Sequence, residues 1–270
     1  MDEAHRPPGR ARTILAALLA LGPAASGAAQ DAEPERLPRV LALGAQADWE
    51  HDSLTDALVT VYDLGRESGL WETVIRTDTR LVTRLALDRN AKNLDSFDAV
   101  FCLVSGELPL ADEQKQALLS FVREGNGFVA AHGATAALAE WPGYVDLLGG
   151  TFDGHPWNEL EVELVVEDPS FPAVAHFPKR FRFADEIYQI AQFSRERSHV
   201  LLSLDTSSVD MQREGVKHSD VPIAWTREYG KGRVFYSSLG HTSGVWARED
   251  VRMMWLEAIK WALRVDGGGE

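Results

Sequence analysis

Apolar and polar positions follow one another along the chain in blocks that predict strands and helices in turn. Continuous apolar runs predict buried strands at 40–45, 71–77 and 128–131 and within 97–106, because a strand covered on both faces needs no polar side. Amphipathic segments predict helices, each with a glycine at its end. Buried strands separated by helices indicate a mainly parallel sheet between two helical layers. The helical segments are 53–69 and 111–127.

The pattern changes after residue 150. Segments 160–168, 180–190 and 199–204 predict further strands, and the first of them alternates like a strand with one solvated face. Segment 221–241 predicts two strands joined by a glycine-rich hairpin turn. An amphipathic segment at 249–265 predicts a closing helix. The sequence therefore predicts one α/β domain with an added antiparallel β segment.

The N-terminus has the order of a secretory signal peptide. Three arginines precede an apolar run at 13–21, and small residues follow it. The run is too short to span a bilayer, which takes about 20 residues. We predict a signal peptide at 1–29, a leader at 30–38 and a folded domain at 39–266. This interpretation implies a periplasmic or extracellular location.

Charge and cysteine content narrow the classes of function. The chain has 27 basic and 41 acidic residues and a net charge of −14, whereas binding to nucleic acid or an anionic membrane needs a basic surface. A small molecule is therefore the expected partner. The single cysteine, Cys102, lies inside an apolar run, which indicates a packing residue rather than a nucleophile and excludes a disulfide within the chain.

Four histidines lie just after predicted strands or in glycine-rich turns. In open α/β sheets, ligands bind beyond the carboxyl ends of the strands, and parallel strands bring these ends to one edge. One histidine in a turn is usually a surface or capping residue, but four such positions predict a shared pocket. The four are His51, His132, His155 and His241, whereas the others, His5, His176, His199 and His218, are expected to lie elsewhere.

Several segments together resemble the ThuA-like (trehalose utilisation) family between Val40 and Leu263. They read, in order, "HDS", "GNGFVAAHGAT", "LLGGTFDGHP", "DEIYQ" and "PIAWTREYGKGRVFYSSLGH". The resemblance implies a flavodoxin-like, class I glutamine amidotransferase-like three-layer sandwich. Those amidotransferases place a cysteine at the turn where this sequence has His132. The resemblance therefore implies the fold without amidotransferase chemistry.

The same resemblance implies a role in carbohydrate catabolism. Some family members are linked to 3-keto sugars made by a partner oxidoreductase, which suggests a functional link of that kind here. The predicted secretion departs from cytoplasmic trehalose use and leaves the substrate open. The family pattern points to a pocket formed by His51, His132, His155, Asp185, Glu186, Tyr188 and His241.

Imidazoles beside a carboxylate suit proton transfer near neutral pH. A keto sugar needs proton transfer next to its carbonyl and no nucleophile, which would explain a histidine at the turn. We expect such a pocket to be solvent-lined and to contribute little to stability. The expected catalytic residues are His132, Glu186, His241 and His155. The expected substrate-binding residues are His51, Tyr188, Asp185, Trp157 and Trp49, since aromatic rings stack on sugars.

Two alternatives stay open. Histidines with a carboxylate can hold zinc or another divalent cation, which would make the protein a metal-dependent hydrolase. The sequence has no H-x-x-x-H pair on a helix, so this set would have to come from separate segments. The other alternative is a carbohydrate-binding protein without catalysis. The metal-binding set would be His51, His132, His155 and His241.

Overall fold

A computed structural model describes Met1 and residues 36–265. Residues 2–29 of the predicted signal peptide at 1–29 lie outside the described residues, as do most of the predicted leader at 30–38 and the last residue, 266, of the predicted domain. The first strand, β1, begins at Arg39. No helix in the described part of the chain has the length and apolar composition needed to cross a membrane.

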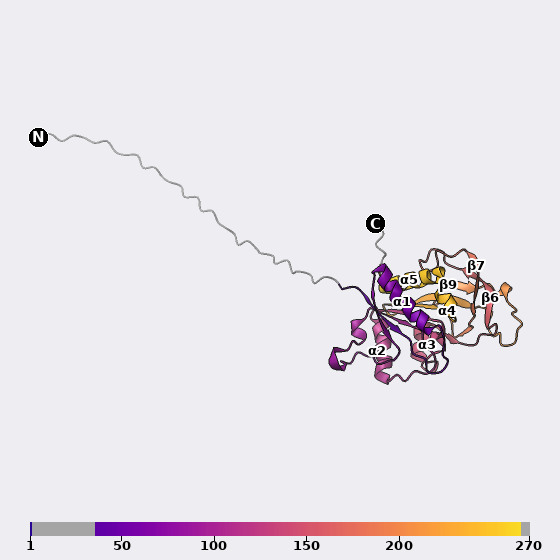
Figure 1. The fold of residues 1–270 in the computed structure, drawn as a ribbon, viewed down its shortest axis with the longest axis horizontal. Coiled ribbons are helices and arrows are strands. Elements are labelled where there is room, and N and C mark those ends of the chain that lie inside the picture. Colours follow the sequence, from indigo (N-terminus) through magenta and orange to yellow (C-terminus); the bar gives the residue numbers. More distant parts are fainter. Residues whose placement is uncertain (2–35, 266–270) are drawn as a thin grey trace. The chain divides into compact units, whose positions relative to one another are not determined.

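Half of the main sheet is parallel (Figure 1). Among the described residues its order is β2-β1-β3-β4-β11, and each neighbouring pair runs in the same direction. The apolar runs predicted as parallel strands are therefore confirmed, and the strands expected at 97–106 and 128–131 are parallel neighbours. The strands are β1 (Arg39–Leu43), β2 (Glu72–Arg76), β3 (Ala99–Cys102), β4 (Gly127–Ala131) and β11 (Gly232–Ser237).

The predicted antiparallel segment continues the same sheet beyond β11. In β6 the apolar side chains of Val162, Leu164 and Val166 are buried, whereas Glu163 and Val165 between them are not, as alternation with one wet face requires. A tight turn places Tyr229 opposite Gly232. The added strands, in order across the sheet, are β10 (Pro222–Tyr229), β9 (His199–Leu204), β6 (Glu159–Val166) and β7 (Arg180–Glu186).

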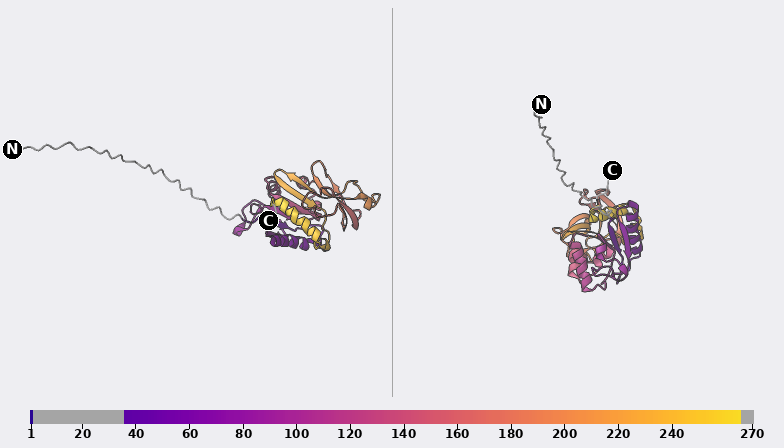
Figure 2. Two further views of the ribbon diagram at one scale, coloured as in Figure 1. Left: turned by 90° about the horizontal axis from the view of Figure 1, so that it is seen from above. Right: turned by 90° about the vertical axis from the view of Figure 1, so that its left-hand side faces the viewer.

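Helices cover both faces of the parallel strands (Figures 1 and 2). Along β1, Val40 and Ala42 pack into one core with α1, α4 and α5, whereas Leu41 and Leu43 pack into a second core with α2 and α3. This arrangement is the predicted three-layer sandwich. The helices are α1 (Leu54–Ser68), α2 (Asp112–Arg123), α3 (Pro142–Leu148), α4 (Ser243–Trp246) and α5 (Glu249–Leu263).

The segment predicted as one strand at 180–190 is interrupted, and the interruption forms part of the pocket. Strand β7 ends at Glu186, and the backbone of Gln189 then exchanges hydrogen bonds with Asp153 and Gly154 instead. Tyr188 lies in the break. A small antiparallel sheet of β5 (Thr151–Phe152) and β8 (Ile190–Ala191) extends this pairing. Short 3₁₀ turns lie at Asp88–Asn90, Leu94–Ser96, His132–Ala136 and Thr206–Ser208.

Candidate active site

His132 stands at the sharp turn that follows β4. Its φ of 42° lies in the left-handed region, which costs energy in a non-glycine residue and concentrates at functional sites. Its Nδ1 lies 2.7 Å from the carbonyl oxygen of Ser238. Because a carbonyl only accepts, Nδ1 carries the proton and Nε2 keeps a lone pair. Burial lowers the pKa of His132 well below its usual value, so the ring is neutral.

Tyr188 donates its hydroxyl to this lone pair. The Tyr188 oxygen lies 2.9 Å from His132 Nε2. Burial raises the pKa of the Tyr188 hydroxyl well above its usual value, so the hydroxyl keeps its proton at neutral pH. The ring of Phe152 packs edge-on against Tyr188 with centroids 4.5 Å apart and holds it in place. The result is a buried donor–acceptor pair facing the predicted pocket.

Glu186 joins three of the predicted histidines. Its Oε2 lies 3.4 Å from His241 Nδ1 and 3.5 Å from His132 Nε2, and its Oε1 lies 3.3 Å from His155 Nδ1. His241 Nδ1 is also 3.3 Å from His132 Nε2. A proton can therefore move among these groups over short distances.

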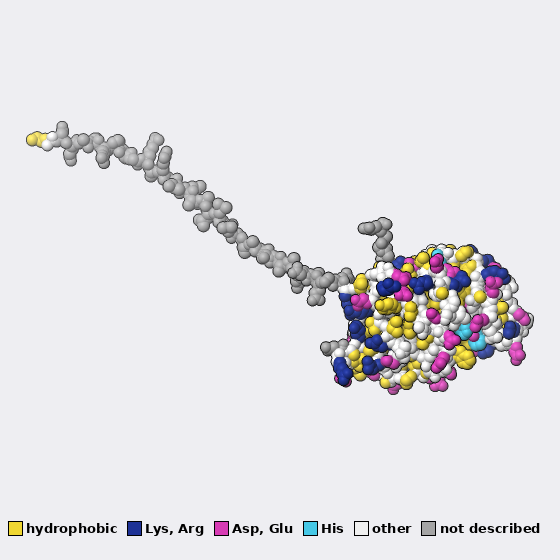
Figure 3. Space-filling model, in the orientation of Figure 1, with side chains coloured by type: hydrophobic (Ala, Val, Ile, Leu, Met, Phe, Trp, Pro, Cys, Tyr) yellow, Lys and Arg dark blue, Asp and Glu magenta, His cyan; other side chains and the backbone are white. Residues whose placement is uncertain are grey.

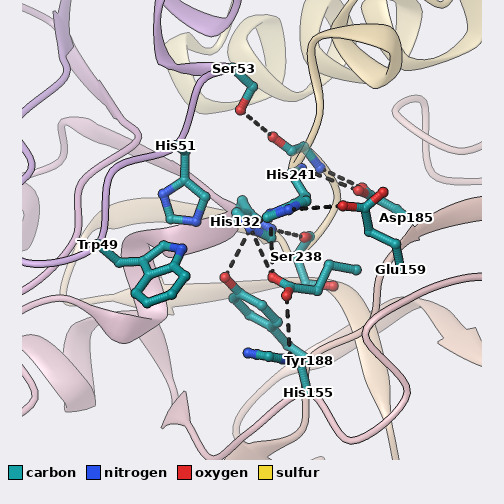
Figure 4. A network of polar contacts seen from close by, with 12 residues as sticks. Trp49, His51, Ser53, His132, His155, Glu159, Asp185, Tyr188, Ser238 and His241 are labelled. Carbon is teal, nitrogen blue, oxygen red and sulfur yellow. Dashed lines mark hydrogen bonds and ion pairs between the residues drawn. The ribbon is translucent and has the colours of Figure 1, made fainter.

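His51 completes the histidine group (Figure 4). Its ring meets the rings of His132 and His241 edge-on, with centroids 4.8 Å and 5.6 Å apart. Burial, helped by the nearby His241, lowers the pKa of His51 to about 4, so this ring is also neutral at pH 7. The structure thus brings together all four histidines that the strand-end argument selected.

Glycine at position 133 permits this approach. A Cβ on Gly133 would lie 3.0 Å from His51 Cε1 and 3.1 Å from the carbonyl oxygen of Val104. Both distances are shorter than ordinary van der Waals contacts, so a larger residue would force the His51 ring or the Val104 backbone to shift. The glycine in "AHGAT" is therefore part of the construction of the site.

Asp185 supports the site from behind instead of lining it. It is 2% exposed, and its carboxylate accepts the backbone N–H groups of Gly240 at 2.7 Å and His241 at 3.2 Å. Burial raises the pKa of Asp185 to about 6, although these hydrogen bonds favour its charged form. The expected substrate-binding role is therefore corrected: Asp185 is buried, fixes the loop that carries His241 and does not line the cavity.

The pocket is a cavity of about 250 Å³. Trp49 lies on its wall with 69% of its surface exposed, so an indole face is free to meet a ligand. Trp157 is 3% exposed and donates its indole N–H to the carbonyl oxygen of Asp210; the prediction that it binds substrate is corrected, because it belongs to the core. The lining residues are Asp48, Trp49, His51, Ser105, Gly106, Ala136, Phe152, His155, Glu186 and Tyr188.

The expectation of a solvent-lined pocket holds for one side only. His155 and His241 reach solvent, with 41% and 22% of their side chains exposed, and histidine side chains gather beside acidic ones on the face shown in Figure 3. His132 has no exposed surface. Its removal would leave a cavity and an unpaired Ser238 carbonyl, so His132 contributes to stability, contrary to the expectation.

Three polar groups of the site were not selected from the sequence. Gln46 bonds to His51, the Ser238 carbonyl bonds to His132, and Glu159 Oε1 lies 3.3 Å from His241 Nε2. Gln46 follows β1 closely, so the strand-end argument could have found it. Glu159 lies opposite Glu186 in the pairing of β6 with β7. No sequence pattern indicates how these two strands align, so Glu159 could not be selected from the sequence.

The donor set fits a metal ion only in part. Nitrogens of His51, His132 and His241 all lie within 4.8 Å of one another, whereas His155 is not part of this group, so the predicted four-histidine set is corrected to three. His132 has its Nδ1–H held by a carbonyl, as metal-binding histidines commonly do, but its Nε2 lone pair already accepts the Tyr188 hydroxyl. His51 does not suit a ligand. The side-chain NH₂ group of Gln46 donates to its Nδ1, so the proton of the neutral ring is on Nε2, the nitrogen that would have to bind the metal.

The remaining described histidines lie outside the pocket. His176 bonds to the Asp250 carbonyl, His199 pairs with Asp168, and His218 pairs with Asp153. Cys102 is buried in β3, and burial raises the pKa of its thiol to about 12, which fits the packing role predicted for it.

These features define a class of protein: a three-layer α/β sandwich with an imidazole at the turn after β4. The chain belongs to the ThuA family, described as trehalose utilisation, whose model matches residues 39–262. No curated protein matches the sequence.

Solved structures share the fold. A ThuA-like protein from Bacteroides uniformis is 22% identical, with a TM-score of 0.70 over 89% of this chain and 98% of its own. A ThuA-like protein from Parabacteroides merdae is 16% identical, with a TM-score of 0.66 over 87% and 93%. A cytoplasmic protein from Salmonella typhimurium is 13% identical, with a TM-score of 0.54 over 83% and 98%. At these identities the likeness concerns the fold.

Proposed function

We propose that this protein carries out acid/base chemistry on a small carbohydrate, a glycoside or a 3-keto sugar, without a covalent nucleophile. The observation that carries the proposal is the 2.9 Å contact between His132 Nε2 and the Tyr188 hydroxyl, in a pocket that also holds Glu186. Neutral imidazole, phenol and carboxylate groups within reach of one another are the components of proton transfer near pH 7.

The groups divide into roles by position. Glu186 lines the pocket and is the group that would take a proton from the carbon next to a sugar carbonyl. Tyr188 lines the same pocket, and its hydroxyl would turn from His132 Nε2 to hydrogen-bond the carbonyl oxygen as negative charge develops there. His132 and His241 both lie within 3.5 Å of Glu186 Oε2, so they would pass the proton onward. The enediolate formed in this way can take the proton back on carbon, or it can expel a glycosidic oxygen, which takes the proton held by Glu186 or a histidine as it leaves.

The size of the pocket supports a small substrate. Its volume of about 250 Å³ lies just below the range of roughly 300–1,000 Å³ typical of small-molecule sites. A single sugar ring suits this space, and the exposed face of Trp49 would stack on its C–H groups. The family's trehalose-utilisation description supports the carbohydrate class.

Location and supply are further parts of the proposal. The order of residues at 1–29 supports export, so the substrate would be met in the periplasm or outside the cell. A 3-keto sugar forms by oxidation of a sugar hydroxyl. An oxidoreductase acting on the same sugar would therefore supply the substrate.

The test is conversion of a 3-keto glycoside and of its parent glycoside, followed by NMR, with wild-type protein and the Glu186→Gln variant. We expect the wild type to convert the keto sugar and Glu186→Gln to be slower by about 10² or more, the scale of a general acid or base. Glu67→Gln, on the exposed surface of α1, is the matched control and should convert the sugar at the wild-type rate.

Two further arms separate the alternatives. Treatment with a chelator should leave the rate unchanged, whereas loss of activity that zinc restores would establish the metal-dependent hydrolase. Binding of the sugar by calorimetry, with no conversion and with equal affinity in Glu186→Gln, would overturn the proposal in favour of a binding protein.

A further inference from the structure

Gln46 holds His51 through both ends of its side-chain amide. The backbone N–H of His51 donates to Gln46 Oε1 at 3.0 Å, and Gln46 Nε2 lies 3.2 Å from His51 Nδ1. A backbone N–H can only donate, so it fixes the orientation of the amide: the oxygen faces the backbone and the NH₂ group faces the ring. His51 Nδ1 is therefore the acceptor of this contact.

An acceptor at Nδ1 places the proton of the neutral ring on Nε2. His132 has the opposite arrangement, because the Ser238 carbonyl at 2.7 Å requires a proton on its Nδ1. Two imidazoles whose centroids are 4.8 Å apart are thus held as opposite tautomers. One presents an N–H donor and the other a lone pair.

We propose that Gln46 is a positioning residue that keeps His51 as a hydrogen-bond donor, through Nε2–H, to an oxygen of the molecule bound in the pocket. His51 lines this cavity together with Tyr188 and Glu186. Its donor would meet a carbonyl or hydroxyl oxygen, while His132 and Glu186 accept protons. The identity of that molecule rests on the proposed function, whereas the tautomer of His51 does not.

The same contact disfavours a metal ion on the three-histidine group. Coordination through His51 Nε2 needs the proton on Nδ1, where it would face the NH₂ group of Gln46. Turning the amide over would bring that NH₂ group against the His51 backbone N–H instead. In either arrangement two N–H donors face each other, which is unfavourable. His51 is therefore not available as the third metal ligand beside His132 and His241 while residue 46 is glutamine.

A carboxylate at position 46 should reverse this state. In Gln46→Glu, one oxygen still accepts the backbone N–H and the other accepts a proton from Nδ1, which frees the lone pair of His51 Nε2. A carboxylate behind a histidine is the support that metal-binding histidines commonly have, and such partners change metal affinity by about 10–100-fold.

The experiment is NMR of protein labelled with ¹⁵N in histidine, in which long-range ¹H–¹⁵N correlations report the tautomer of each ring. The His51→Asn variant identifies the His51 signals. We expect wild-type His51 to carry its proton on Nε2 at pH 7 and Gln46→Glu to move it to Nδ1. Calorimetry with zinc should show an affinity at least about 10-fold higher in Gln46→Glu than in wild type.

Gln116→Glu is the matched control. Gln116 is exposed on α2, so this variant has the same charge change and should show the wild-type tautomer and zinc affinity. A proton on Nδ1 of wild-type His51 would overturn the proposal even if Gln46→Glu failed to fold. An unchanged tautomer in folded Gln46→Glu would also overturn it. Neither the tautomer measurement nor the zinc titration uses a sugar. Both results can therefore be interpreted even if the proposed function is wrong.

Discussion

Acidification should destabilise the native protein through His51. Its pKa is lowered from 6.5 to about 4, so between these values the unfolded chain binds a proton that the folded protein does not. The contribution of His51 to stability is therefore complete above pH 6.5 and is lost as the pH falls toward 4. At 1.36 kcal/mol per pKa unit, the full loss is about 3.4 kcal/mol, of which about 2 kcal/mol falls between pH 7 and pH 5.

The measurement is urea unfolding of wild type and His51→Asn at both pH values. Asparagine does not titrate, and its side-chain oxygen can still accept from Gln46. Asp185 acts in the opposite direction, because a pKa raised to about 6 makes the folded state gain stability as the pH falls through the range from 6 to 3.8. Asp185 is present in both proteins, so its contribution cancels from the difference between them. Wild type should lose about 2 kcal/mol more than the variant; a difference that stays constant within about 0.5 kcal/mol would refute the reasoning.

Three other changes test separate parts of the site. Tyr188→Phe removes the hydroxyl bonded to His132, so turnover of a 3-keto sugar should fall by about 10²-fold while urea unfolding shifts by only about 1 kcal/mol; equal turnover would exclude a role for the hydroxyl. Asp185→Asn replaces the acceptor of two backbone N–H groups, and a loss of about 1–3 kcal/mol in urea unfolding is expected. Gly133→Ala should displace His51 and lower turnover, whereas Gly244→Ala, whose Cβ would meet only Thr242 Oγ1 at 3.8 Å, should not. Finally, intact mass of the exported protein should show a start near Ala29 or Gln30, and a full-length chain kept in the cytosol would contradict the predicted signal peptide.

The parallel half of the fold could be predicted because local pattern alone determines it. Buried strands such as "FVAA" are apolar on both sides, and the helices between them have glycine at their ends, so a parallel sheet between two helical layers followed. The four histidines could be chosen because strand ends in a parallel sheet meet at one edge.

The remaining features depend on contacts between distant segments. Glu159 meets His241 only because β6 pairs with β7 in one register, and no local pattern fixes a register between strands. Trp157 is buried in the core and Trp49 is exposed at the pocket. The sequence could not distinguish them, because each is a tryptophan close to a pocket histidine along the chain. The tautomers of His51 and His132 depend on single hydrogen bonds with Gln46 and Ser238.

Deuterium incorporation from solvent tests the acid/base function most directly. A 3-keto sugar is incubated in D₂O with wild-type protein, Glu186→Gln or Tyr188→Phe, and NMR follows the hydrogens on the carbons next to the carbonyl. Wild type should exchange one of these hydrogens for deuterium faster than the uncatalysed reaction, and each variant should slow the exchange by about 10²-fold. A wild-type protein that binds the sugar and leaves these hydrogens unexchanged and the sugar intact would contradict the account.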